Sequence, residues 1–168
     1  DYLTEQYLDL DALLGAIDLD REALAVPDTL LPAHCIDVAC NLAAERGGDP
    51  LFCFKAGQRM RPSHLGVVGH MLLCCRSIED VAMLLTRYSR LISNGAEVET
   101  ISEDDKLSLV IRVAQGRNLQ NVRTSHDYSV SGWITMCQWL GGEKMTPRFM
   151  QFMGPEEVSY DSIREQLD

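Results

Sequence analysis

Histidine and cysteine are the residues of this chain best suited to bind a ligand or a metal directly. The sequence holds four histidines and six cysteines. His70 lies inside a run of apolar residues and stands one helical turn before Cys74. Because a buried imidazole must hydrogen-bond to some partner, His70 is interpreted as a satisfied core histidine, a polar group facing a ligand or a haem axial ligand.

The cysteines are not spaced as metal ligands usually are. No C-x-x-C pair occurs, and His34, Cys35 and Cys40 form only a partial ligand set without two further ligands at a plausible spacing. We therefore predict no bound metal and no resident cofactor. The cysteines are interpreted as small hydrophobic residues of a protein in a reducing compartment, the cytoplasm.

Catalytic templates are missing from the sequence. It contains no G-x-S-x-G elbow, no phosphate-binding P-loop, no H-E-x-x-H and no G-x-G-x-x-G after a strand. The carboxylates of residues 18–22 and 103–105 stand where turns and helix caps are expected, whereas an acid–base pair needs a sheltered cleft. Since no nucleophile is paired with a base, the chain is predicted not to be an enzyme.

Six residues are candidates for a ligand pocket, because they add polar or soft atoms to otherwise aliphatic helix faces. Aromatic and sulfur-bearing residues at helical spacing also fill ordinary protein cores, so core packing is the alternative for several of them. The candidates are His70, Cys74, Tyr88, Trp133, Met136 and Cys137.

Composition and charge limit the partners of the chain. Its 168 residues and 46% hydrophobic content are typical of about one globular domain. With 25 acidic and 15 basic residues the formal net charge is −10, so this piece is not predicted to bind DNA phosphates itself. No stretch reaches the roughly 18 uninterrupted apolar residues of a spanning helix, and no membrane partner is predicted.

Helical patterns dominate the first third of the chain. Asp9 and Asp20 are good capping residues, and each precedes a short predicted helix, the second of which ends before Pro27. A third helix begins near Pro32 and stops at the glycine pair that starts with Gly47.

Two further helices contain the first candidates. Nearly every residue of His64–Cys75 is apolar or small, which predicts a helix buried on all sides, with Gly66 and Gly69 allowing another backbone to approach closely. Ser77 and Asp80 then form a capping-box-like pair that begins an amphipathic helix.

The hydrophobic period changes from helical to alternating near residue 97. Glu97–Ile101 and Leu107–Val113 predict an antiparallel hairpin, which is followed by a helix over Ser125–Leu140. A strand over Met145–Met153 and a last helix from Pro155 complete the pattern. The predicted fold class is α+β, with helices packed on a small, mainly antiparallel sheet in a single domain.

The order of these segments resembles the N-terminal effector-binding domain of AraC-type transcriptional regulators, in the arabinose-binding-like branch that includes the ornithine-utilisation regulator. His64–Leu73, Ser77–Ala82 and Arg87–Leu91 resemble three successive motifs of that family, and Phe52–Gly57 resembles an earlier one. The closing segment MTPRFMQFMGPEEVSYDSI is also similar, so the resemblance covers nearly the whole chain. Cys53 departs from it, because the family usually has glycine there.

The resemblance implies an allosteric sensor that spans residues 1–168. A small effector would bind between the sheet and the helices, and its differential affinity for two states would shift DNA binding. DNA would be contacted only by a C-terminal helix-turn-helix domain, which is not visible after Tyr160. The chain, which opens on Asp1, is thus expected to be a piece of a longer protein. Whether two copies pair as a homodimer is left open.

The interior favours a partly apolar effector over a sugar, because it offers many Leu, Met and Cys side chains and few polar groups. Two alternatives stay open. One is a haem or cofactor sensor built on His70 or a cysteine, and the other is a pure dimerisation module in which the region of Trp133 packs against a second copy.

Overall fold

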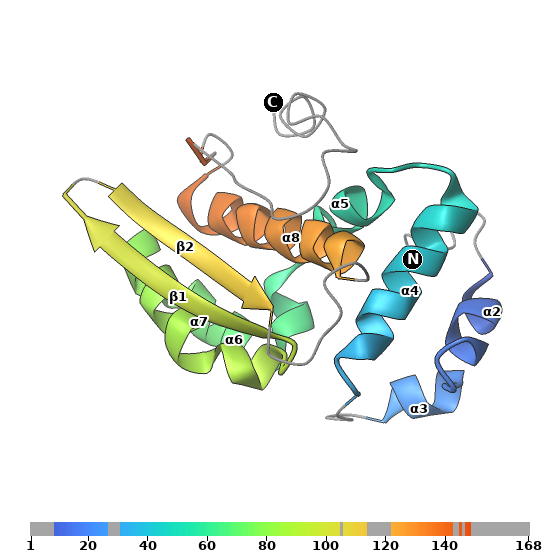
Figure 1. The fold of residues 1–168 in the computed structure, drawn as a ribbon. Helices are drawn as coiled ribbons and strands as arrows, with labels where there is room; N and C mark the ends of the chain where they lie inside the picture. Colours follow the sequence, from blue (N-terminus) through green and yellow to red (C-terminus); the bar gives the residue numbers. More distant parts are fainter. Residues whose placement is uncertain are drawn as a thin grey trace.

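A long helix, α8, forms the centre of the computed structural model, with other helices on one side and a β-hairpin on the other (Figure 1). The structure describes residues 9–26, 31–104, 106–113, 122–142, 145 and 147–148. In chain order the elements are α2 (Leu10–Gly15), α3 (Arg21–Ala25), α4 (His34–Gly47), α5 (Phe52–Gly57), the 3-10 helix η1 (Pro62–Leu65), α6 (Gly66–Leu73), α7 (Ile78–Ile92), β1 (Ala96–Glu103), β2 (Lys106–Val113) and α8 (Arg123–Gly141). The α+β prediction is confirmed.

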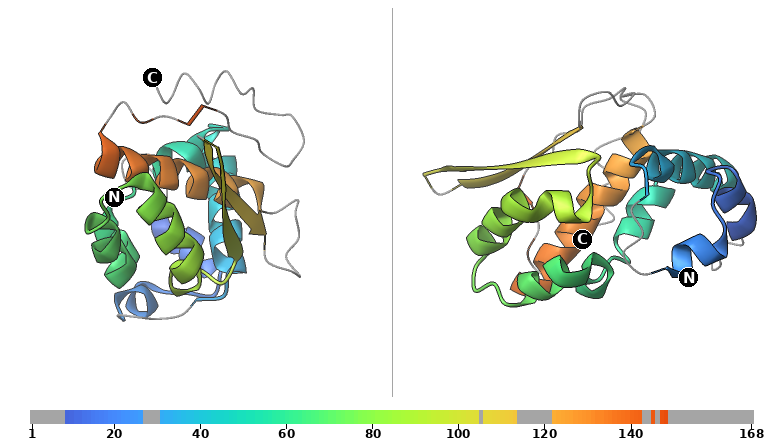
Figure 2. Two further views of the ribbon diagram at one scale, coloured as in Figure 1. Left: turned by 90° about the vertical axis from the view of Figure 1, so that its left-hand side faces the viewer. Right: turned by 90° about the horizontal axis from the view of Figure 1, so that it is seen from below.

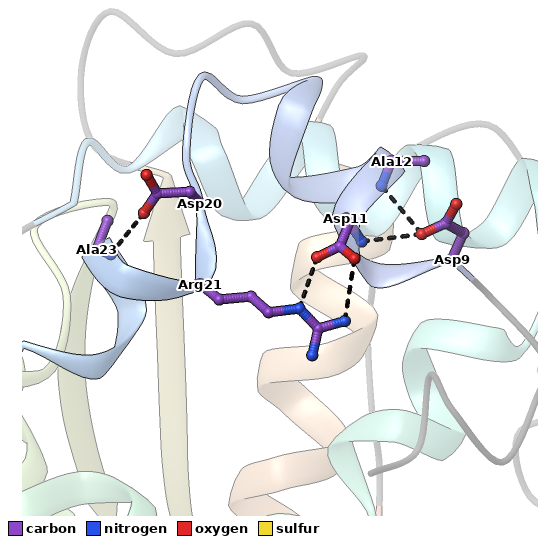
Figure 3. A network of polar contacts seen from close by, with 6 residues as sticks. All are labelled: Asp9, Asp11, Ala12, Asp20, Arg21 and Ala23. Atoms are coloured by element: carbon purple, nitrogen blue, oxygen red, sulfur yellow. Dashed lines mark hydrogen bonds and ion pairs between the residues drawn. The ribbon is translucent and has the colours of Figure 1, made fainter.

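Aspartates begin both N-terminal helices, as predicted. The side chain of Asp9 accepts hydrogen bonds from two backbone N–H groups of α2, and that of Asp20 accepts one from Ala23 of α3 (Figure 3). Arg21 also donates two hydrogen bonds to the carboxylate of Asp11, which ties the two helices together. The right-hand view of Figure 2 places these helices at the end of the molecule opposite the hairpin.

Helices α4 and α5 pack against α8 at the N-terminal side of the fold. The apolar segment that starts at Leu51 forms the short helix α5, and Phe52, Cys53 and Phe54 are all buried. A Cβ atom at Gly57 would overlap the hydroxyl of Ser131 and a carbonyl oxygen of α8. The absence of a side chain therefore lets α5 lie directly on α8.

Helix α6 departs from the sequence prediction, because only one of its faces is buried. Val68, Gly69 and Leu72 are buried, whereas 65% of Val67 and 53% of Leu73 is exposed. The prediction of burial on all sides was wrong, because α6 is covered on one side only, by η1 and α7. An all-apolar sequence does not determine which other elements pack against a helix, and so does not determine which of its faces are buried.

The two glycines of α6 have different roles. A Cβ atom at Gly69 would overlap the carbonyl oxygen of Pro62, so the predicted close backbone approach is confirmed at this position. It is wrong at Gly66, where a Cβ atom would meet nothing within 4 Å. Gly66 instead has φ +54°, a left-handed conformation that glycine adopts readily where η1 passes into α6.

Helix α7 begins at the predicted capping box. The Asp80 backbone N–H donates to the hydroxyl of Ser77 at 3.1 Å, and the Asp80 carboxylate accepts from the Ser77 N–H at 3.1 Å. Val81, Ala82 and Leu85 are buried, which confirms the amphipathic pattern. Val81 and Leu85 pack with Val68 and Leu72 of α6 in the core between α6, α7 and the hairpin.

The predicted hairpin is confirmed in the described part of the chain. β1 pairs with β2 in antiparallel register, from Ala96 opposite Val113 to Glu103 opposite Lys106. The hydroxyl of Thr100 lies 2.6 Å from that of Thr86 on α7 and donates to the carbonyl oxygen of Ala82 at 3.0 Å. These contacts hold the hairpin along α7, as both views of Figure 2 show.

Helix α8 confirms the helix predicted over Ser125–Leu140 and extends it slightly at both ends. The predicted strand over Met145–Met153 lies largely outside the described residues, and the predicted helix from Pro155 lies entirely outside them. Within the described residues, none of the helices combines the length and the apolar character that crossing a membrane requires.

Candidate functional site

A pocket of about 310 Å³ lies where the hairpin, η1, α7 and α8 meet. Such a volume is at the lower end of the range for small-molecule sites. Ile36, His64 and Ser93 line it and are exposed, so the pocket opens to solvent beside these residues. The site is therefore built by the elements that join the helical part of the fold to the hairpin.

One part of the lining is apolar. Val98 of β1 and Ile111 of β2 face it from the hairpin, where they stand opposite each other in the register. Leu65, Ile92 and Trp133 contribute from the helical side. Trp133 also packs against the buried α6–α7 core, which fixes the position of its ring.

The rest of the lining carries hydroxyl and imidazole groups. Ser125, His126, Tyr128 and Ser129 lie on the first turns of α8, and Ser89 lies on α7. Burial raises the pKa of the Tyr128 phenol, which therefore stays protonated and can donate a hydrogen bond. The Nε2 atom of His126 is buried as well. The pocket thus combines an apolar wall with several hydroxyl groups and an imidazole that can form hydrogen bonds.

A buried polar layer between α4 and α8 supports the wall of the pocket. The hydroxyl of Ser125 donates to the carboxylate of Asp37 at 2.5 Å, and both residues are buried. Beside this contact, Thr124 donates to the side-chain oxygen of Asn41 at 2.5 Å. The lining serine of α8 is therefore directly connected to a carboxylate on α4.

Asp127 lies on the same turns of α8 and is only 6% exposed. Burial raises the pKa of its carboxyl group to about 6, and the nearby charge of Arg123 acts in the opposite direction. Cys40 and Cys53 are also buried in this region, and the Cys53 thiol donates to the carbonyl oxygen of Cys40 at 3.3 Å. Their hydrogen bonding and burial raise the pKa of the Cys40 thiol, so it stays neutral and a poor nucleophile.

The structure brings only Trp133 of the six sequence candidates to this pocket. Tyr88 is half-buried against the α6–α7 core, and the guanidinium of Arg87 lies 5.4 Å from its ring centroid. Met136 is fully buried, and Cys137 is half-buried. The last two candidates, on or next to α6, are described separately below.

His70 and Cys74 are exposed, so the expectation that His70 is a core residue is wrong. Nδ1 of His70 lies 2.9 Å from the carbonyl oxygen of Gly66, one turn earlier in the chain. These residues lie on the uncovered side of α6 and do not line the pocket. A role in ligand binding stays a prediction for all six candidates, Trp133 included.

Sequence reasoning missed the serines of the pocket, although a signal for them exists. Ser125, Ser129 and Trp133 are spaced four residues apart and so share one face of α8. Ser89 lies in the last turn of α7, and Ser93 directly follows that helix. The sequence prediction rested on soft and aromatic atoms, and serine was not among the predicted ligand-binding residues. Among the residues that the structure describes, no group of three or more His, Cys, Asp or Glu side chains is placed to hold a metal ion.

The described residues thus form an α+β domain with a pocket of about 310 Å³ beside its hairpin. Residues 8–166 match the family described as the arabinose-binding domain of AraC transcription regulator, N-terminal. The chain belongs to this family, and the resemblance expected from its motifs is confirmed. The family is a ligand-binding regulatory domain of a transcription regulator. A comparison with curated proteins gave no match.

Proposed function

We propose that this chain senses a small, partly apolar effector and thereby controls DNA binding by a C-terminal helix-turn-helix module of the full regulator. The effector would bind in the pocket between the hairpin and α8. The observation that carries this proposal is the mixed lining of that pocket, in which Val98, Ile111 and Trp133 face several uncharged hydroxyl groups. An apolar wall with a few convergent polar groups is typical of a small-molecule site.

The position of the pocket suggests how occupancy would be relayed. Its walls belong to different elements, and α8 also contacts α4 and α5 on its other side. A ligand that binds one arrangement of these elements better than another shifts the equilibrium between them. The Ser125–Asp37 hydrogen bond supports a path from the pocket to α4.

The acidic charge of the chain supports a division of labour within the full regulator. At a formal net charge of −10 this domain repels DNA phosphates, so the DNA-binding surface belongs on a separate, basic module. We propose that the regulator works in the cytoplasm and that this domain has no catalytic activity of its own.

Filling the pocket tests the proposal. Ser129→Leu places a larger side chain that suits a helix into the cavity, whereas Gln138→Leu makes the same kind of change on α8 away from it. We expect compounds from a metabolite library to raise the melting temperature of the wild type and of Gln138→Leu by about 5–10 °C near a hundredfold excess over Kd. The Ser129→Leu variant should show little or no shift.

Two results would contradict ligand sensing at this site. One is stabilisation that survives in Ser129→Leu unchanged, and the other is a wild type that no compound stabilises. In the full regulator, a stabilising compound should also change the affinity for operator DNA, measured by gel mobility shift, in the wild type and not in Ser129→Leu.

A dimerisation module is the second candidate function, and exposed apolar side chains favour it. Trp139 is 59% exposed near the end of α8, and Leu91 is 66% exposed on α7. Analytical ultracentrifugation of the wild type and Trp139→Ala tests this reading. A dimer that Trp139→Ala dissociates, together with an absence of any stabilising ligand, would favour it over sensing.

Haem sensing receives little support from the structure. His70, the proposed axial ligand, is exposed and its Nδ1 is already within hydrogen-bond distance of a backbone carbonyl oxygen. A Soret band that survives purification and disappears in His70→Ala would revive this alternative.

A further inference from the structure

The two serine hydroxyl groups that α8 contributes to the pocket, those of Ser125 and Ser129, have already used their protons. Ser129 donates to the backbone carbonyl oxygen of Ser125 at 2.8 Å. Ser125 lies 2.5 Å from the Asp37 carboxylate and 2.9 Å from the carbonyl oxygen of Val122, and its proton serves one of these acceptors. A serine hydroxyl has a single proton and two lone pairs. Both oxygens can therefore only accept a hydrogen bond from a guest.

The charges around the pocket disfavour an ionised guest. Among the described residues that line it there is no Asp, Glu, Lys or Arg side chain. The carboxyl group of Asp37 lies directly behind Ser125, so an anion at this end would stand close to a second acidic group. An ion that leaves water without a partner of opposite charge loses most of its solvation energy.

From these two observations we propose that the pocket selects an uncharged ligand that donates a hydrogen bond, such as an alcohol or a primary amide on an apolar body. The donor group would point at Ser125 and Ser129, and the apolar body would lie against Val98, Ile111 and Trp133. This inference rests on the proposed sensing function and specifies the chemical class of its effector.

Four probes that share one rigid apolar body test the inference. Adamantylmethanol is an uncharged donor, and its isomer methoxyadamantane has the same atoms but can only accept. Adamantanecarboxylate and adamantylmethylammonium carry the two charges. Binding is measured through the emission of Trp133 in Trp139→Phe, which leaves Trp133 as the only tryptophan of the chain.

At neutral pH we expect the alcohol to bind with a Kd about threefold to tenfold below that of its ether isomer, the difference that one neutral hydrogen bond makes. The two charged probes should bind more than about tenfold more weakly than the alcohol, because the described lining holds no Asp, Glu, Lys or Arg side chain to pair with either of them. Equal binding of alcohol and ether, or tighter binding of either ion, would overturn the inference.

A pair of variants assigns the difference to α8. Ser129→Ala removes an acceptor from the pocket and should abolish the preference for alcohol over ether. Thr135→Ala is the matched control, because Thr135 makes the same kind of hydrogen bond, to the carbonyl oxygen of Ser131 at 2.9 Å, outside the pocket. It should leave the preference unchanged. A preference that persists in Ser129→Ala would contradict the role given to the serine oxygens.

The inference about the ligand and the proposal of sensing can fail separately. The charge of the library compounds that stabilise the wild type distinguishes the two. Charged compounds whose effect disappears in Ser129→Leu would overturn the inference and leave sensing intact. A complete absence of stabilising compounds, the four probes included, would contradict both. Uncharged donors among the stabilising compounds would support both.

Discussion

Among single residues, Asp127 gives the domain a pH dependence whose sign follows from its burial. Its pKa rises from an ordinary 3.8 in the unfolded chain to about 6 in the folded protein. Between these values the folded state holds a proton that the unfolded state has lost, so the free energy of unfolding falls as pH rises through this window. The ionised carboxylate is then a destabilising group at neutral pH.

Asp127→Asn should therefore stabilise the domain above about pH 6, by at most about 3 kcal/mol, and have little effect below about pH 4. Urea unfolding at about pH 4 and about pH 7.5 measures the difference. Asp11→Asn is the control, because Asp11 is exposed and its pKa is lowered by its hydrogen bond with Arg21. A pH dependence equal in wild type and Asp127→Asn would show that Asp127 is not the group responsible.

Residue type alone was a poor guide to which side chains line the pocket. His70 and Cys74 were predicted from their soft and polar atoms, yet His70 lies on the uncovered face of α6 and Cys74 is exposed directly after this helix. Serines looked unremarkable by type, although Ser125 and Ser129 face the pocket. Which face of a helix meets a cavity depends on its rotation, and its rotation is set by packing partners that are distant in the chain.

Among the elements, those with strong local signals were predictable. The caps of α2, α3 and α7 depend on contacts within a few residues, and the alternating pattern of the hairpin specifies two faces. The burial of α6 was not predictable in this way, because it depends on where η1 and α7 lie. Contacts such as those of Gly57 with α8 join segments more than 70 residues apart, and no local sequence pattern predicts them.

The packing of α6 on η1 can be tested at Gly69, because the absence of a side chain there lets α6 lie against η1. Gly69→Ala would drive a methyl group into the carbonyl of Pro62, a backbone atom that cannot move aside easily. We expect a loss of about 1–3 kcal/mol in the free energy of unfolding, measured with urea.

Gly15→Ala provides the matched control for this change. A Cβ atom at Gly15, the last residue of α2, would meet nothing within 4 Å. Alanine there should be neutral or stabilise by up to about 1 kcal/mol. Similar losses of unfolding free energy in Gly69→Ala and Gly15→Ala would mean that the overlap with Pro62 does not cause the destabilisation.

For the whole molecule, the central feature is that α8 lies between two parts of the fold, the hairpin and the helices α4 and α5 (Figure 1). One side of the helix closes the pocket with the hairpin, and the other side packs on α4 and α5 (Figure 1). The hydrogen bonds of Ser125 and Thr124 to α4 cross between these parts. A ligand that changes how the first turns of α8 sit would thus affect both parts together.

Hydrogen–deuterium exchange with and without a stabilising compound tests the central claim most directly. We predict slower exchange in residues 89–98, 106–113 and 122–133, where the pocket residues of α7, the hairpin and α8 lie. Helices α2 and α3, at the other end of the molecule, should exchange as before. Protection confined to α6, or exchange that the compound leaves unchanged around the pocket, would contradict ligand binding at this site.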